Sequence, residues 1–72
     1  MINNILKHMR KQKGLSQEQL AKLLNIGRTT LAGYEQNYRD PKFEMIEAIA
    51  NYCGYEIQFI NKKTKEILTT RK

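Results

Sequence analysis

Apolar residues recur every three or four positions in four stretches of the chain, the spacing of one face of an α-helix. Ser16 followed by Gln19 has the form of a capping box, which marks the start of a helix. Gly14 and Gly54 each follow an apolar stretch, where glycine commonly ends a helix. The pattern therefore predicts helices over about residues 2–13, 17–24, 28–36 and 42–53.

The period of the pattern changes to two after residue 54, which is typical of β-strands. Tyr55, Ile57 and Phe59 alternate with their neighbours, and a second strand over residues 66–70 follows a polar turn. The prediction is a mainly α fold in which a helical bundle is followed by a C-terminal β-hairpin. We assign residues 1–54 to the bundle and residues 55–72 to the hairpin and tail, as parts of a single domain.

The length and the charge of the chain limit the classes of protein to which it can belong. Seventy-two residues suffice for one small domain and exclude a multi-domain enzyme. The formal charge is +6, with +4 in residues 1–15, +4 in residues 61–72 and −3 in residues 43–60. A basic chain with one acidic segment suggests a surface for a polyanion and a second surface for another contact.

Catalytic and metal-binding patterns are not found in the sequence. Cys53 and His8 are the single cysteine and histidine, which excludes an internal disulfide and falls short of the four ligands of a structural zinc site. We expect Cys53 to belong to the core, and we expect no cofactor, no metal and no enzymatic activity. The sequence shows neither a secretory signal nor a membrane-spanning stretch, so the expected location is the cytoplasm, without a membrane partner.

The segment from residue 17 to residue 36 suggests how a polyanion is bound. It contains two short helices joined by a tight turn at residues 25–27, where Asn25 tolerates the left-handed conformation. The outward positions of the second helix carry small and polar residues, namely Arg28, Thr29, Thr30, Ala32 and Gly33. An α-helix fits the DNA major groove, where arginine bonds guanine and threonine contacts base edges. The alternative is an ordinary solvent-facing surface, but threonine and glycine are poor choices for one.

The same segment resembles a known family. The residues that carry the likeness are Leu6-Lys7-x-x-Arg10-Lys11-x-x-Gly14-Leu15-Ser16-Gln17-Glu18-x-Leu20-Ala21, with Ile26 and Tyr34-Glu35 downstream. They are similar to the helix-turn-helix family of lambda-type phage repressors, Cro and related bacterial regulators, over about residues 5–53. The resemblance implies a compact four-helix lambda-repressor-like bundle whose second motif helix enters the major groove of double-stranded DNA.

The resemblance also implies roles for individual residues. Gln17 corresponds to a residue that holds a phosphate and braces the helix that reads DNA. The base- and backbone-facing positions are Gly27, Arg28, Thr29, Thr30 and Gly33. The loop that follows lies along the phosphates in the family and corresponds to Gln36, Asn37, Tyr38, Arg39 and Lys42. Arg10 and Glu35 match a structural ion pair.

Two positions depart from the family pattern. Asn25 stands where glycine is usual, and Gly33 stands where many relatives place a base-reading side chain. Direct reading would then rest on residues 28–30, with DNA shape supplying more. Arg28 fits two roles equally well, as a base reader or as a phosphate clamp.

The hairpin is the candidate for dimerisation, because one reading domain covers half a site. Its apolar residues exceed what one small core needs, and they are Ile57, Phe59, Ile60, Ile67 and Leu68. The alternative is a hairpin that only folds back over the first and fourth helices. The function expected is a sequence-specific regulator, a repressor that binds an inverted-repeat operator as a homodimer. The alternative function is an antitoxin that binds a toxin protein and autoregulates its operon.

Overall fold

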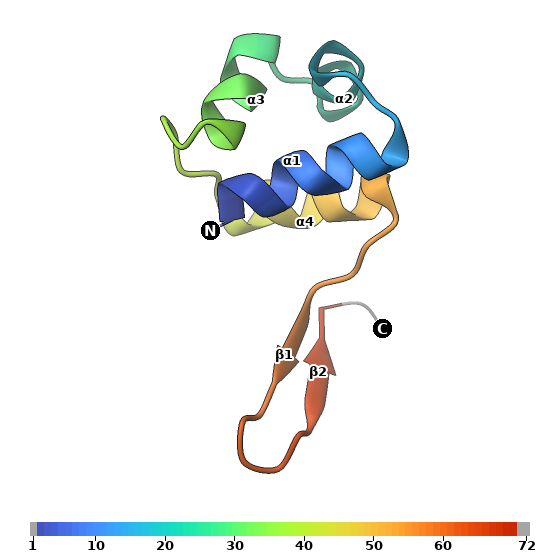
Figure 1. Ribbon diagram of the computed structural model, residues 1–72, viewed down its shortest axis with the longest axis vertical. Helices are drawn as coiled ribbons and strands as arrows, with labels where there is room; N and C mark the ends of the chain where they lie inside the picture. The colour runs from blue at the N-terminus through green and yellow to red at the C-terminus, as the bar shows by residue number, and fades with distance from the viewer. Residues whose placement is uncertain (1, 71–72) are drawn as a thin grey trace.

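The computed structural model describes residues 2–70, and over this range four helices precede two strands (Figure 1). The two pairs of helices form layers: α1 and α4 lie side by side, and α2 and α3 lie across them. The element bounds are α1 Ile2–Lys13, α2 Gln17–Leu24, α3 Arg28–Glu35, α4 Phe43–Cys53, β1 Gln58–Ile60 and β2 Ile67–Thr69. The predicted fold class, a mainly α bundle with a C-terminal hairpin, is confirmed.

Local signals set the helix boundaries. Ser16 and Gln19 form the predicted capping box: the Ser16 hydroxyl accepts from the Gln19 amide at 3.0 Å, and the Gln19 side chain accepts from the Ser16 amide at 2.8 Å. Asn25 ends α2 in the left-handed conformation (φ 58°), and Gly54 ends α4 with φ 84°. Because each signal acts within four residues, these boundaries follow from the sequence alone.

The core lies where the four helices meet. Leu6, Leu20, Leu31 and Ile49 come from α1, α2, α3 and α4 respectively, and all four are fully buried. Burial of each such side chain contributes about 1.5–3 kcal/mol, so this cluster holds the two layers together. The remaining buried apolar residues are Met9, Ala21, Ala50 and Cys53.

The start of α4 differs from the prediction. The helix begins at Phe43, one residue later than expected, with Lys42 as N-cap and Pro41 outside the helix. Phe43 is an apolar residue in the first turn of this helix, yet 44% of its surface is exposed. The reason is that the buried residues of α4, beginning at Ile49, lie in its C-terminal half.

The hairpin projects away from the helices (Figure 1). Its strands are antiparallel and pair Phe59 with Leu68 and Ile60 with Ile67, and all their residues are exposed. Both strands are shorter than predicted, because residues 55–57 form a linker and Ile57 packs against the core of its own bundle. The structure contradicts the alternative of a hairpin folded back over α1 and α4.

The projecting hairpin gives the molecule an elongated shape. The Cα radius of gyration is 13.0 Å, and the principal extents are 40 × 23 × 19 Å. A compact chain of this length has a radius of gyration of about 11 Å. Within residues 2–70, no helix combines the length and the apolar character needed to cross a membrane.

Candidate nucleic-acid interface

The first turn of α3 presents polar side chains to solvent. Arg28 and Thr29 are exposed, and Thr30 is half-buried. Gly27 is the N-cap in an extended conformation, offers no side-chain cap and is followed by no acidic residue in the first turn. The unpaired N–H groups and the dipole at such a helix start favour a negatively charged ligand.

Gly33 is not on the exposed surface where we expected it. It is buried, because the aliphatic part of Arg39 lies across it. A methyl group at Gly33 would lie 3.0 Å from Cδ and 3.2 Å from Cγ of Arg39. Glycine therefore lets the Arg39 side chain lie directly against α3.

The loop after α3 is anchored to that helix. The Gly33 carbonyl accepts from the Tyr38 amide at 2.8 Å and from the Arg39 amide at 3.2 Å. Asn37 makes the turn in the left-handed conformation, with φ 65°. Tyr38 is 81% exposed, and Gln36, Asn37, Arg39 and Lys42 are also exposed. The loop thus forms a polar surface continuous with α3.

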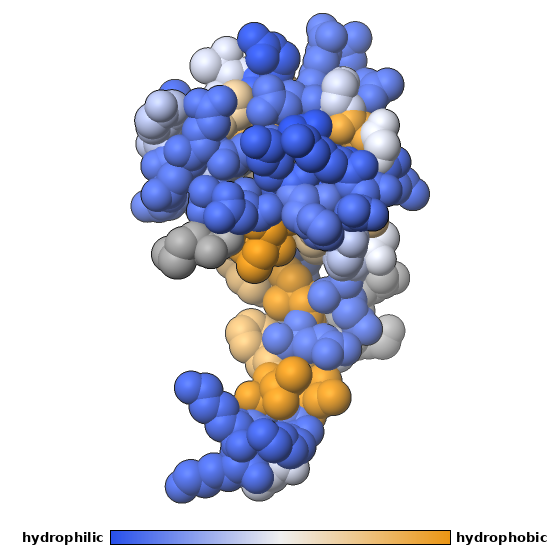
Figure 2. All heavy atoms as spheres, in the orientation of Figure 1, coloured by the Kyte–Doolittle hydropathy of each residue, from blue (hydrophilic) through white to orange (hydrophobic). Residues whose placement is uncertain are grey.

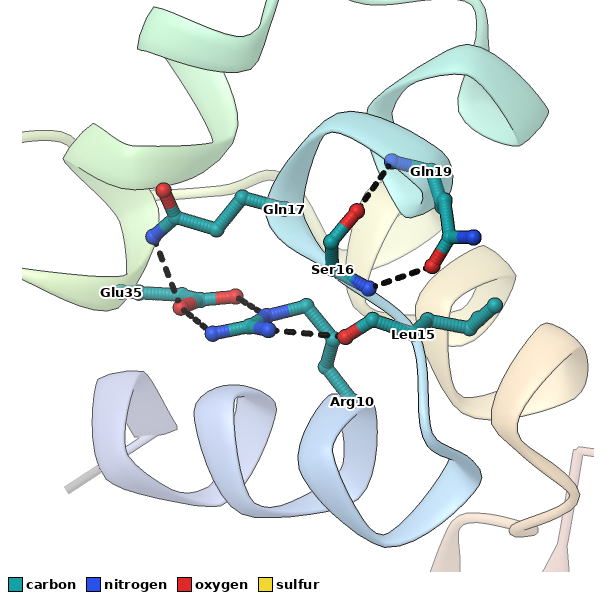
Figure 3. Close-up of polar contacts among 6 residues, drawn as sticks. All are labelled: Arg10, Leu15, Ser16, Gln17, Gln19 and Glu35. Atoms are coloured by element: carbon teal, nitrogen blue, oxygen red, sulfur yellow. Dashed lines mark hydrogen bonds and ion pairs between the residues drawn. The ribbon is translucent and has the colours of Figure 1, made fainter.

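A buried ion pair fixes the other end of α3 (Figure 3). Arg10 of α1 donates through Nε to Glu35 at 2.7 Å and through Nη2 at 2.9 Å, and both residues are buried. Arg10 also donates to the Leu15 carbonyl at 2.8 Å. The Gln17 side chain, at the start of α2, donates to Glu35 at 3.1 Å. One carboxylate therefore joins α1, α2 and α3.

Each residue of this ion pair stabilises the charged form of the other. The hydrogen bond to Glu35 raises the pKa of Arg10 above its ordinary value. Burial by itself would raise the pKa of Glu35, but the hydrogen bonds from Arg10 and Gln17 and the charge of Arg10 outweigh it, so this pKa is lowered. Glu35 is therefore ionised at neutral pH, and α3 is held in one orientation relative to α1.

The structure brings some of the expected site residues into contact. The Gln17 side chain donates a hydrogen bond to Glu35 at the end of α3, and the Arg39 side chain of the loop packs against Gly33. Sequence reasoning missed the contact between Gly33 and Arg39. The available signal was a glycine at an expected reading position followed, six residues later, by a long basic side chain.

The described residues include one free cysteine and no metal-binding group. Across residues 2–70, no three His, Cys, Asp or Glu side chains are grouped to hold a metal ion. Cys53 is a free thiol buried in the core, and burial raises its pKa. A raised pKa keeps the thiol protonated and unreactive at neutral pH.

Known proteins resemble this chain over the same region. A family model described as helix-turn-helix matches residues 6–60. The transcriptional repressor RstR of the cryptic phage CTXphi of Vibrio cholerae is 30% identical over 57 residues, 79% of this chain and 51% of RstR. The HTH-type transcriptional regulator ImmR of Bacillus subtilis is 39% identical over 55 residues, 76% of this chain and 43% of ImmR.

A third relative is similar over most of its own length. An uncharacterised HTH-type transcriptional regulator of Methanocaldococcus jannaschii is 36% identical over 59 residues, 82% of this chain and 89% of that protein. The chain spans only about half the length of RstR and ImmR. No solved structure gives a significant match. With the matched region, the helical fold and the relatives in agreement, the chain belongs to the lambda repressor- and Cro-like family of helix-turn-helix DNA-binding regulators.

Proposed function

We propose that this protein is a sequence-specific repressor of transcription that acts in the cytoplasm and binds an inverted-repeat operator as a homodimer. The observation that carries the proposal is the setting of α3. Its uncapped first turn presents Arg28 and Thr29, while its last residue, Glu35, is held by the buried pair with Arg10. Two of the relatives, RstR and the immunity repressor of Bacillus phage phi105, are named as repressors.

The proposed mechanism places α3 in the major groove. Arg28 and Thr29 then face base edges, and each good bidentate pair contributes about 1–3 kcal/mol of discrimination. Lys42 and the exposed loop at residues 36–39 lie toward the phosphates, where they fix position without reading sequence. Gln17 holds α3 in place through its hydrogen bond to Glu35, and in this proposal it lies beside the contacts to the DNA phosphates.

A homodimer would supply the second half-site. One short helix contacts only a few base pairs, and paired half-sites about 34 Å apart are the usual arrangement in this fold. The projecting hairpin supports this proposal: Phe59, Ile60, Ile67 and Leu68 are each more than half exposed. Burying these side chains against a second copy would remove them from water.

Affinity selection from random duplex DNA at near-physiological salt tests the function. We expect enrichment of an inverted repeat with half-sites about one helical turn apart. Recovery of unselected DNA that dissociates as salt rises would contradict base reading, because phosphate attraction alone has that signature.

The exposed hairpin also supports a second candidate function, that of an antitoxin. In that case the hairpin or the acidic segment 43–60 binds a toxin protein, and DNA binding serves autoregulation. Stoichiometric co-purification of an unrelated protein, with loss of that protein on Phe59→Asp, would favour the antitoxin over the homodimeric repressor.

A further inference from the structure

An apolar groove of about 510 Å³ lies along the bundle on the side where the hairpin leaves it. Ile2, Ile5 and Met9 of α1 form one wall, Ile46 and Ala50 of α4 form another, and the linker closes it at Ile57. Ile5, one of the residues that line this groove, is 53% exposed. Apolar surfaces of this kind on a small protein commonly mark an interaction site.

The hairpin carries apolar residues on both of its faces. Phe59 pairs with Leu68, so these two side chains share one face, and Ile60 and Ile67 share the other. Because the hairpin projects from the bundle, neither face is covered by its own chain (Figure 1). An isolated two-stranded hairpin is marginally stable in water, so this one needs a surface to pack against.

We propose that the hairpin of a second copy fills this groove, and that each of two copies places its Phe59–Leu68 face in the groove of the other. This inference rests on the homodimer of the proposed function and specifies its contact. A two-fold axis generates the contact twice, which closes the assembly at two copies.

The first support is that the apolar surface is continuous. Figure 2 shows hydrophobic residues gathered beneath the bundle and along the hairpin, whereas the end formed by α2 and α3 is mostly hydrophilic on the face shown. One surface of each copy thus contains both the groove and the side chains that fill it. A contact made there leaves α3 uncovered at the opposite end of the molecule (Figure 1).

The second support is the area available. Four large side chains of the hairpin are each exposed by more than half, and the groove adds its own walls. Phe59 and Leu68 enter the groove while Ile60 and Ile67 lie on the other face, so each of the two reciprocal contacts buries on the order of a few hundred square ångströms. A standard stable interface buries roughly 800 Å² per partner, which two reciprocal contacts approach.

The third support is charge complementarity. The turn of the hairpin carries Lys62, Lys63 and Lys65, all exposed. The segment 43–60, which supplies α4 and the linker to the groove, carries three glutamates and no basic residue. The basic hairpin tip is therefore attracted to the α4 and linker side of the groove in another copy, where Glu56 lies, whereas the α1 wall belongs to the basic segment at residues 1–15.

Complementation between two variants tests the exchange. Phe59→Asp damages the hairpin and leaves the groove intact, whereas Ile5→Lys damages the groove and leaves the hairpin intact. Each variant alone should dimerise at least about tenfold more weakly, because a charge would enter an apolar contact. Mixed together they should form a heterodimer, since one intact contact remains and the other pairs Asp with Lys. Sedimentation gives the affinities, and native mass spectrometry identifies the heterodimer.

Leu23→Lys is the matched control, because Leu23 is 48% exposed on α2 and outside the groove, so this variant should dimerise like the wild type. Circular dichroism and thermal unfolding check that each variant keeps its fold.

Wild-type affinity in folded Ile5→Lys would overturn the groove contact and leave the homodimer standing. Weakened single variants that form no heterodimer would overturn the exchange. A monomeric wild type would overturn both the exchange and the homodimer, while the selection from random DNA separately tests base reading.

Discussion

Arg10 and Glu35 are the buried charged residues among residues 2–70. Hydrogen bonds within the protein replace the water that each charge loses on burial. Arg10 uses three nitrogen donors and Glu35 uses both oxygens. No buried side-chain polar atom in the described part of the chain lacks a partner. Removing one member of such a pair leaves the other charge buried and uncompensated, which is far more costly than losing an exposed pair. The pair therefore couples the stability of the fold to the orientation of α3.

The first prediction concerns Glu35→Gln. We expect this change to lower the free energy of unfolding at neutral pH by about 3–5 kcal/mol, because it leaves the Arg10 charge buried without a counter-charge. Glu18→Gln, at an exposed position, is the control and should change it by less than about 1 kcal/mol. Denaturant titration at pH 7 measures both variants.

The lowered pKa of Glu35 sets the pH dependence. Its contribution to stability is fully present above the ordinary carboxyl pKa near 4.5 and is lost as pH falls through the lowered pKa of the folded state. The wild type should therefore lose more stability than Glu35→Gln as the pH falls below about 4.5. Parallel stability curves for the two proteins in this range would contradict the assignment.

Gly33 and Arg39 show how a residue without a side chain can determine where another side chain lies. The close contact of Arg39 with Gly33 and the two amide bonds to the Gly33 carbonyl hold the loop against α3. The arginine then extends from the place where a side chain at position 33 would stand. The second prediction follows from this arrangement.

Gly33→Ala should separate stability from DNA binding. Alanine is favoured over glycine in a helix by about 0.5–1 kcal/mol, so the free energy of unfolding should be unchanged or rise by up to that amount. The added methyl group requires Cδ and Cγ of Arg39 to move by a few tenths of an ångström, so affinity for the selected duplex should fall, but by less than in Arg39→Ala, where the phosphate contact is removed. Fluorescence anisotropy with a labelled duplex measures affinity. Wild-type affinity in Gly33→Ala would show that the position of Arg39 has no part in binding.

At the scale of elements, α3 and the loop after it have different tasks in the proposed function. Arg28 and Thr29 stand in the first turn of α3, where side chains project beyond the helix start. Lys42 stands at the far end of the loop, next to the start of α4. A groove-reading helix determines sequence preference, whereas a phosphate contact contributes affinity common to all sequences.

The third prediction is a difference in specificity between these elements. Arg28→Ala or Thr29→Ala should reduce discrimination between the selected site and a scrambled duplex. An arginine that bonds a guanine contributes about 1–3 kcal/mol to this discrimination, so the larger loss is expected at Arg28. Lys42→Ala should weaken binding to both duplexes by the same factor and reduce the salt dependence by about one phosphate. Equal losses on both duplexes for all three variants would remove α3 from the role of reader.

The whole molecule has two ends of different character. The end with α2 and α3 is polar, and the opposite end has the groove and the hairpin (Figures 1 and 2). With the apolar end used for pairing, the two copies of α3 have a fixed separation and a fixed rotation about the DNA axis. The spacing of the half-sites then becomes a property of the dimer as a whole.

The fourth prediction is a strict dependence on that spacing. Inserting about five base pairs between the selected half-sites turns one of them to the other side of the duplex. Affinity should fall to that of a single half-site, and insertion of a full turn of about ten base pairs should not restore it without bending of the DNA. The mobility of complexes on the spacing series measures this dependence. Unchanged affinity after the half-turn insertion would contradict a rigid dimer.

The sequence by itself determined the elements and several of their ends, although α4 begins one residue later and both strands are shorter than predicted. The capping box at Ser16, the left-handed turn at Asn25 and the glycine at Gly54 act through hydrogen bonds within a few residues, so they operate whatever the rest of the chain does. The apolar period also located most of the core positions, because residues three or four apart share one face of a helix. The motif residues likewise pointed to the DNA-binding family before any packing was known.

The tertiary structure decided what each element covers. The exposure of Phe43, the burial of Gly33 under Arg39 and the projection of the hairpin all depend on which segments meet in space. Periodicity shows which side of an element is apolar, but it does not show whether a neighbour reaches that side. The groove between α1, α4 and the linker is the clearest case, because its walls come from three segments that only the fold brings together.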